Sequence, residues 1–190
     1  MTTRCNPILS KGFLNVAQEG LENAARSLEI LVDGKLTMDI LWAGSVPTSR
    51  LCEVTGNPED LVIGAYVEVG GDSRGHAVLM FPKDSALHLS DLALCKPIGS
   101  STELGAMEES VVQEVANILT SSYLTAIADH YHITLWPEPP ATAVDMAAAI
   151  IDNVILCSGQ FESETLSIVT RFRGHDVVMD GVFLYIPELT

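Results

Sequence analysis

Apolar residues recur at helical spacing in two long stretches of the chain. In residues 10–32 they return every three or four positions, and Asp33-Gly34 follows as a stop signal. In residues 103–129 neither Gly nor Pro occurs after Gly105. The spacing predicts two long helices, whose apolar faces are Phe13, Leu14, Ala17, Leu21, Ala24, Leu28 and Leu31 in the first, and Val111, Val112, Val115, Ala116, Ile118 and Leu119 in the second.

Shorter apolar runs between turn signals predict six strands. A glycine-rich turn, GGDSRG, joins two of them as a hairpin. This turn lacks the Lys-Ser/Thr ending of a phosphate-binding loop and leads into a strand, so we do not assign it to phosphate. Residues 45–57 are expected to be irregular or a short helix, and residues 82–94 and 142–152 to be short helices. The strands are expected at 36–42, 61–69, 77–81, 132–136, 165–172 and 177–186.

The order of expected elements occurs twice along the chain. Superposing the halves at an offset of about a hundred residues pairs the two long helices, and the end of the strand at 77–81 echoes the end of the strand at 177–186. We therefore expect one α+β domain over residues 1–190, made of two pseudo-symmetric halves at about 7–96 and 97–190. Its mostly antiparallel six-stranded sheet would carry the two long helices on it.

The second long helix carries a narrow polar stripe. Ser110, Glu114, Asn117 and Ser121 fall at i, i+4, i+7 and i+11, which is one line along a helix. One interpretation of such a stripe is that it is simply the solvent-exposed side of a packed helix. A solvent-exposed surface without a function would, however, mix charges of both signs. This stripe contains neither Lys nor Arg.

The spacing Ser110-x3-Glu114-x2-Asn117, completed by Pro140 after 22 intervening residues, resembles the signature of the CheC-type phosphatases. That family includes CheC, CheX and FliY, and the length and order of segments here are most similar to CheC. The resemblance implies a phosphatase of chemotaxis-type two-component signalling. Its substrate would be the phosphoaspartate of a CheY-like response regulator, and CheD is a further candidate partner.

The residue types suit that chemistry. Phosphoryl transfer depends on positioning and charge stabilisation more than on covalent catalysis, and an amide can orient an attacking water, as a glutamine does in GTPases. Asn117 is the candidate for this role, and Glu114 would pair with a cationic group of the regulator. Ser110 is expected to support the site by hydrogen bonding, and Pro140 to fix the loop beside the helix. A divalent metal, Mg²⁺, is expected on the regulator rather than on this chain.

The first half would hold a degenerate copy of the site. Lys11, Asn15 and Gln18 stand where the second half has Ser110, Glu114 and Asn117, and no proline follows at the matching distance. The carboxylate is lost and the amide is one methylene longer. We predict that Asn15 and Gln18 form an inactive site.

The composition of the chain argues against several classes of partner and against a metal site. A net charge of −15 argues against nucleic acid or an anionic membrane as partner. Residues 1–13 lack the apolar stretch of a signal peptide, and no apolar run approaches the ~20 residues that span a bilayer, so we expect a cytoplasmic protein without membrane insertion. The four cysteines are scattered, and His130 and His132 have no nameable third partner, so no metal site is expected.

A second class of function stays open. The chain could be a non-catalytic adaptor that binds a response regulator, CheD or a component of the flagellar switch. The intact Ser–Glu–Asn–Pro pattern of the second half favours the enzyme.

Overall fold

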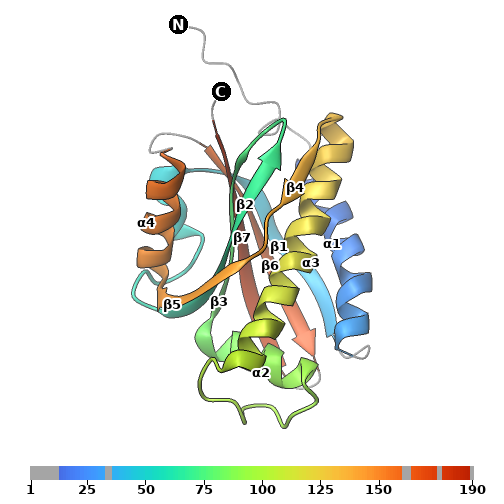
Figure 1. Ribbon diagram of the computed structural model, residues 1–190, viewed down its shortest axis with the longest axis vertical. Helices are drawn as coiled ribbons and strands as arrows, with labels where there is room; N and C mark the ends of the chain where they lie inside the picture. Colours follow the sequence, from blue (N-terminus) through green and yellow to red (C-terminus); the bar gives the residue numbers. More distant parts are fainter. Residues whose placement is uncertain (1–12, 33–35, 160–163, 175–176, 189–190) are drawn as a thin grey trace, which may run out of the picture.

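The computed structural model describes residues 13–32, 36–159, 164–174 and 177–188, and it shows a single antiparallel sheet with helices on both faces (Figure 1). The helices are α1 (Phe13–Leu31), α2 (Lys83–Ala93), α3 (Ala106–Tyr131) and α4 (Ala147–Ser158), with a short 3-10 helix, η2 (Thr48–Glu53). The strands are β1 (Leu36–Pro47), β2 (Leu61–Gly71), β3 (Gly75–Pro82), β4 (Leu135–Pro137), β5 (Ala141–Met146), β6 (Glu164–Gly174) and β7 (Val177–Pro187).

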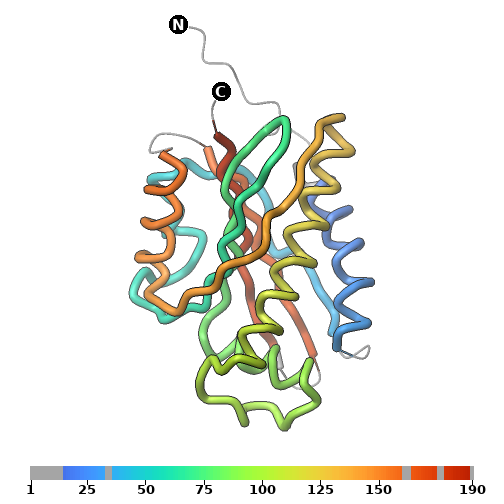
Figure 2. Tube along the Cα trace, in the orientation of Figure 1, coloured from blue at the N-terminus to red at the C-terminus, as the bar shows by residue number. Residues whose placement is uncertain are grey.

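The strands lie in the order β1-β6-β7-β3-β2-β4, and β5 also pairs with β2. All these pairings are antiparallel. The sheet has seven strands where six were expected, because β4 and β5 share the position beside β2, one after the other along the same edge (Figure 2). The α+β class and the antiparallel sheet with packed long helices are confirmed.

Two cores lie on opposite faces of the sheet. The larger core joins α1, α2 and α3 to alternate strand residues such as Ile63, Leu79 and Phe183. The smaller core joins α4 and η2 to the residues in between, such as Val78 and Leu184. Because both faces are covered there, the central strand β3 is apolar almost throughout.

Two expectations near the site are wrong. Residues 142–152 were expected to be one helix, but Ala141–Met146 is a strand and α4 begins only at Ala147. The strand expected at 132–136 is the three-residue β4, because α3 continues to Tyr131 and ends at His132, whose φ of 54° is left-handed. The helix expected at 82–94 is confirmed as α2, and η2 lies within the region expected to be irregular or a short helix.

Candidate functional site

Helix α3 is fixed by its apolar side. Val112, Val115, Ala116 and Leu119 are at most 1% exposed and pack in the larger core. The opposite side leaves Ser110, Glu114 and Asn117 exposed to solvent, as the spacing predicted. The Ser110 hydroxyl donates to the carbonyl of Ala106, one turn back, at 2.9 Å.

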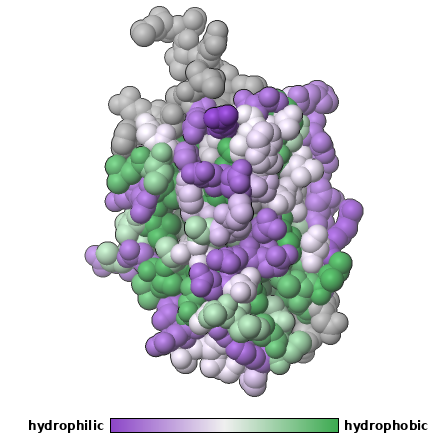
Figure 3. All heavy atoms as spheres, in the orientation of Figure 1, coloured by the Kyte–Doolittle hydropathy of each residue, from purple (hydrophilic) through white to green (hydrophobic). Residues whose placement is uncertain are grey.

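The exposed stripe of α3 forms one side of a groove of about 350 Å³, which we call the α3 groove. Its helix side consists of Ser110, Gln113, Glu114 and Asn117, and its other side is the β4–β5 connection at Pro137, Glu138, Pro139 and Pro140. The structure thus brings Ser110, Glu114, Asn117 and Pro140 together, although 22 residues of sequence separate the last two. Figure 3 shows hydrophilic side chains gathered across the middle of this face.

The β4–β5 side of the groove is a break in the edge strand. Pro137 pairs with Val69, the N–H of Glu138 donates to the carbonyl of Glu68 at 2.8 Å, and pairing resumes where Ala141 faces Tyr66. Between those pairs β2 has residues 67–68, whereas the facing strand has residues 138–140, one residue more. Pro139 and Pro140 have no N–H to offer the ladder, so the extra residue forms a bulge there.

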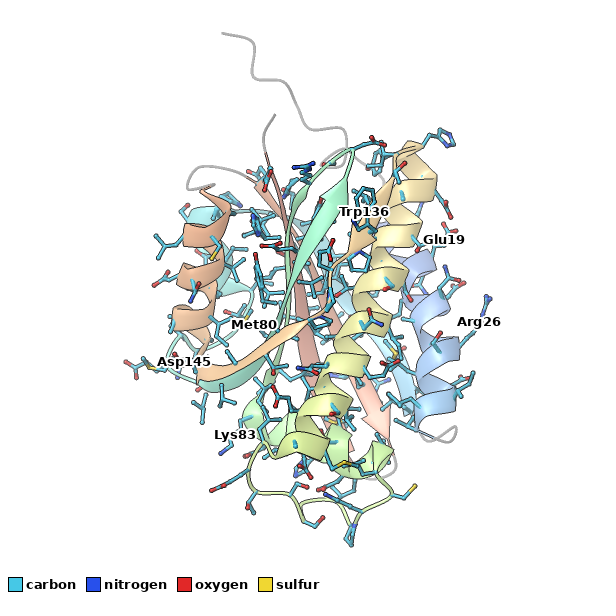
Figure 4. The ribbon with its side chains drawn as sticks, in the orientation of Figure 1. Glu19, Arg26, Met80, Lys83, Trp136 and Asp145 are labelled. Atoms are coloured by element: carbon cyan, nitrogen blue, oxygen red, sulfur yellow. The ribbon has the colours of Figure 1, made fainter. Side chains whose placement is uncertain are left out.

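The residue before this break is held across the sheet edge. Trp136, labelled in Figure 4, pairs with Gly70 of β2, and its ring is so close that a Cβ on the glycine would stand 2.5 Å from the indole nitrogen. A side chain at position 70 would therefore push this tryptophan away and disturb the start of the groove wall.

The groove carries negative charge without a neutralising cation. Residues 97–170 contain neither Lys nor Arg, and within the described ranges Glu114 and Asn117 make no hydrogen bond or ion pair to another side chain. A few carboxylates elsewhere are paired, as Glu108 is with Lys96 at 2.5 Å and Asp180 with Arg171 at 2.7 Å. The groove can therefore offer a free carboxylate to a cation and a free amide to a water molecule.

The two histidines considered for a metal are both exposed, and the His130 ring stacks edge-on against Tyr131. In the part of the chain that the structure describes, no group of three or more His, Cys, Asp or Glu could hold a metal ion. Cys52, Cys95 and Cys157 are free thiols, and Cys5 lies outside the described residues. None of the described helices is long and apolar enough to cross a membrane.

The corresponding residues of the first half lie on α1. Asn15 and Gln18 are exposed, and the Gln18 amide donates to Glu22 at 3.3 Å, while Lys11 lies outside the described residues. In β1 the pairing with β6 shifts register between Ile40 and Trp42, at Leu41. No acid accompanies the amide at these positions, and their inactivity stays a prediction.

Sequence reasoning missed several groove residues. Gln113 lies one turn after Ser110 on the side of the stripe, and Glu138 lies in the proline-rich break. Glu109, which directly precedes the groove residue Ser110 but does not line the groove, was also missed, and its carboxylate accepts a hydrogen bond from the hydroxyl of Thr142 on β5. Gln113 could have been found from its i+3 spacing to Ser110, whereas the Glu109–Thr142 contact required the position of β5.

Comparison with known proteins agrees with this architecture. The model of the CheC-like family matches residues 107–144, which include Ser110, Glu114, Asn117 and Pro140. The chain is 26% identical over 177 residues to the CheY-P phosphatase CheC of Bacillus subtilis (strain 168), covering 91% of this chain and 85% of that protein.

Two solved structures show the same fold. FliY of Thermotoga maritima matches with a TM-score of 0.74 at 14% identity, over 97% of this chain and 92% of that one. A chain of the CheX–CheY–BeF3–Mg²⁺ complex of Borrelia burgdorferi matches with a TM-score of 0.55 at 12% identity. The match covers 92% of this chain and 97% of that one. At these identities the likeness concerns the fold alone.

Proposed function

From the premise that the chain is CheC-like in sequence and fold, we propose that it is a phosphatase for the phosphoaspartate of a CheY-like response regulator. The observation that carries the proposal is the convergence of Ser110, Glu114, Asn117 and Pro140 on one solvent-open groove. The Bacillus relative, whose name specifies CheY-P as substrate, supports the choice of regulator.

In the proposed reaction, the regulator receives the exposed stripe of α3 in its phosphorylated pocket. The Asn117 side-chain oxygen accepts a hydrogen bond from a water molecule and aligns it opposite the aspartyl oxygen. The water oxygen bonds to phosphorus as the bond from phosphorus to the aspartyl oxygen breaks. The products are inorganic phosphate, which carries the water's oxygen and its protons as dihydrogen phosphate, and the free aspartate carboxylate.

Glu114 would dock the helix rather than react. Its carboxylate is exposed and unpaired among the described residues, so it can accept an ion pair from a regulator lysine. The groove has no Lys or Arg of its own with which to neutralise a phosphoryl group. We therefore assign that neutralisation to the regulator, through its own divalent metal and lysine.

The supporting residues act on position. Ser110 bonds back to the helix and keeps its hydroxyl along the groove. Pro139 and Pro140 remove two N–H donors and set the shape of the opposite wall. Neither role requires contact with phosphorus.

The test is the decay of a phosphorylated CheY-like regulator with and without this protein, at one magnesium concentration. We expect faster decay, and a fall of about 10²–10³-fold in the assisted rate for Asn117→Ala, the size seen when one preorganised amide is removed. Asn23→Ala, a helical asparagine on α1, is the matched control. Full assisted activity in Asn117→Ala would remove the amide from the mechanism.

A second candidate is an adaptor that binds a regulator, CheD or a flagellar-switch component without hydrolysis. The fold that the chain shares with FliY is compatible with such an adaptor. In that case the regulator would bind in a pull-down while its phosphate decayed at the unassisted rate. CheD binding, proposed here only as an additional interaction, would be read from the same pull-down.

A further inference from the structure

We propose that Glu109 and Thr142 are positioning residues, which hold the two sides of the α3 groove at their working separation. The inference rests on the proposed function, because that separation matters only if a partner uses the groove. Its structural basis is the hydrogen bond from the Thr142 hydroxyl to the Glu109 carboxylate.

The two sides of the groove come from elements that are anchored separately. Helix α3 is held by its buried side in the larger core, which faces away from the groove. The opposite wall is held by backbone pairing of Pro137 and Ala141 to β2. Between these anchors Glu138 still donates to the carbonyl of Glu68, but Pro139 and Pro140 have no N–H to offer, so backbone pairing does not hold these two residues against β2.

The side-chain bond links both sides at one end of the groove. Glu109 directly precedes Ser110 on α3, and Thr142 follows Pro140 by two residues on β5. A hydroxyl donating to a carboxylate is a charge-assisted bond, stronger than one between neutral groups. It therefore fixes where Pro140 stands relative to Glu114 and Asn117.

The degenerate half lacks the donor for such a bond. At the 99-residue offset that relates Gln18 to Asn117, Thr142 corresponds to Ala43 on β1. Alanine has no hydroxyl, so no equivalent bond can form from that position. The link therefore accompanies the half that has the complete set of groove residues.

Glu109 also lies in the first turn of α3, where an acidic side chain stabilises the helix end. Thr142 makes no contribution of that kind, so Thr142→Val separates the two roles. This change keeps the shape of the side chain and removes its hydroxyl, and Thr142→Ser restores a hydroxyl. Thr37→Val is the matched control, because Thr37 is an exposed threonine of β1, the edge strand on the opposite side of the sheet.

We expect Thr142→Val to lower kcat for assisted dephosphorylation about tenfold, with KM changed little, because misplacing a positioned group by ~1 Å can cost about 10²-fold. Thr142→Ser and Thr37→Val should stay near wild type. In an Asn117→Ala background Thr142→Val should have no further effect, since the wall that the link positions contributes to the reaction only together with Asn117. Additive losses, or equal losses in Thr142→Ser, would overturn the inference.

A second measurement does not depend on activity. Hydrogen–deuterium exchange should be faster in Thr142→Val over residues 137–146, with α2 unchanged. If the wild-type protein proves inactive, the proposed function fails, and the exchange result alone decides whether the link positions the wall. Unchanged exchange in Thr142→Val overturns it.

Discussion

Glu114 and Asn117 lie three residues apart on α3, yet they can contribute differently to one reaction. A carboxylate cannot donate a hydrogen bond and strongly attracts a cation, whereas a neutral amide can orient water without competing for the metal or lysine of a partner. The proposed division of work assigns binding to Glu114 and rate to Asn117.

Replacing Glu114 with alanine should therefore raise KM for the phosphorylated regulator by about tenfold, equivalent to ~1.4 kcal/mol of binding. The value of kcat should change much less, because the amide stays in place. The measurement is the initial rate of phosphate release across a range of regulator concentrations. Asp129→Ala, which removes an exposed acid outside the groove on the same helix, should leave both constants unchanged. A large fall in kcat with unchanged KM would mean that Glu114 acts in the chemical step and not in binding.

The first-half residues give an internal comparison. Gln18→Ala should leave assisted dephosphorylation within about twofold of wild type, because Gln18 has no acid one turn before it on α1 and donates instead to Glu22. The same decay assay measures it. A loss as large as that of Asn117→Ala would show that the first half is an active site.

At this scale the sequence was sufficient for Ser110, Glu114 and Asn117, because helical spacing alone places them on one line. It was insufficient for Glu109, because the partner Thr142 was expected within a helix and stands on a strand. Side-chain contacts between elements depend on the position of both elements, and periodicity within one of them does not contain that position.

Among the elements, α1 and α3 approach closely at Gly20. A Cβ at this position would lie 2.6 Å from Cδ1 and 3.1 Å from Cα of Tyr123, and 3.3 Å from the carbonyl oxygen of Ser122. Since two of these atoms are backbone, rotation of the tyrosine alone cannot make room. The close packing of the two long helices thus requires a residue without a side chain.

Gly20→Ala should consequently destabilise the protein by ~1–3 kcal/mol, the usual penalty for overpacking. In an unobstructed helix the same change would stabilise by about 1 kcal/mol, so the sign of the effect tests the contact. Chemical denaturation measures the free energy of unfolding. Ser27→Ala, at an exposed position of α1, should change it by less than about 0.5 kcal/mol. An increase in stability for Gly20→Ala would contradict the packing described here.

The misplaced element, residues 142–152, shows where local preference fails. Its alanines favour a helix, and no turn residue separates Asp145 from Ala147. The first part is nevertheless a strand, because the edge of β2 from Leu61 to Tyr66 offers it a ladder. Pairing with a distant strand overrides propensity in a way that no local pattern reveals.

For the molecule as a whole, stability depends on two carboxylates that organise the loop from α2 to α3. Asp91 is fully buried and accepts hydrogen bonds from the backbone of Gly99 at 2.8 Å and Ser100 at 3.0 Å. Burial raises the pKa of Asp91, but the bonds from Ser101, Ser100 and Gly99 outweigh it and hold the pKa below its usual value. The hydrogen bond from Lys96 likewise lowers the pKa of Glu108.

A depressed folded-state pKa means that unfolding takes up protons, so this stability is complete above the unfolded-state values, about pH 4, and is lost as pH falls through the folded values. Asp91→Asn should lower the stability at pH 7 by ~1–3 kcal/mol, because it weakens the acceptor in a buried network. It should also reduce the fall in Tm between pH 5.5 and pH 3.5.

Thermal unfolding followed by circular dichroism at both pH values measures this. Asp129→Asn, at an exposed acid, should behave as wild type. An Asp91→Asn protein with the full wild-type loss of Tm on acidification would exclude Asp91 as a source of the acid sensitivity.

Both edge strands of the sheet contain an irregularity in their pairing. The register shift of β1 falls at Leu41, which is 99 residues before Pro140, the offset that relates Gln18 to Asn117. The pseudo-symmetry of the two halves stays a prediction. The sequence did not reveal the irregular pairing of either edge strand, because a bulge is defined by the partner strand.

The prolines opposite Asn117 have an effect beyond the shape of the groove. They interrupt the outermost strand of the sheet, where an unbroken row of free N–H and C=O groups would invite a strand from another molecule. The same two residues that shape one side of the groove thus make this border a poor template for aggregation. Selection for a shaped reaction site and selection against intermolecular β-pairing would act here on one short segment of backbone.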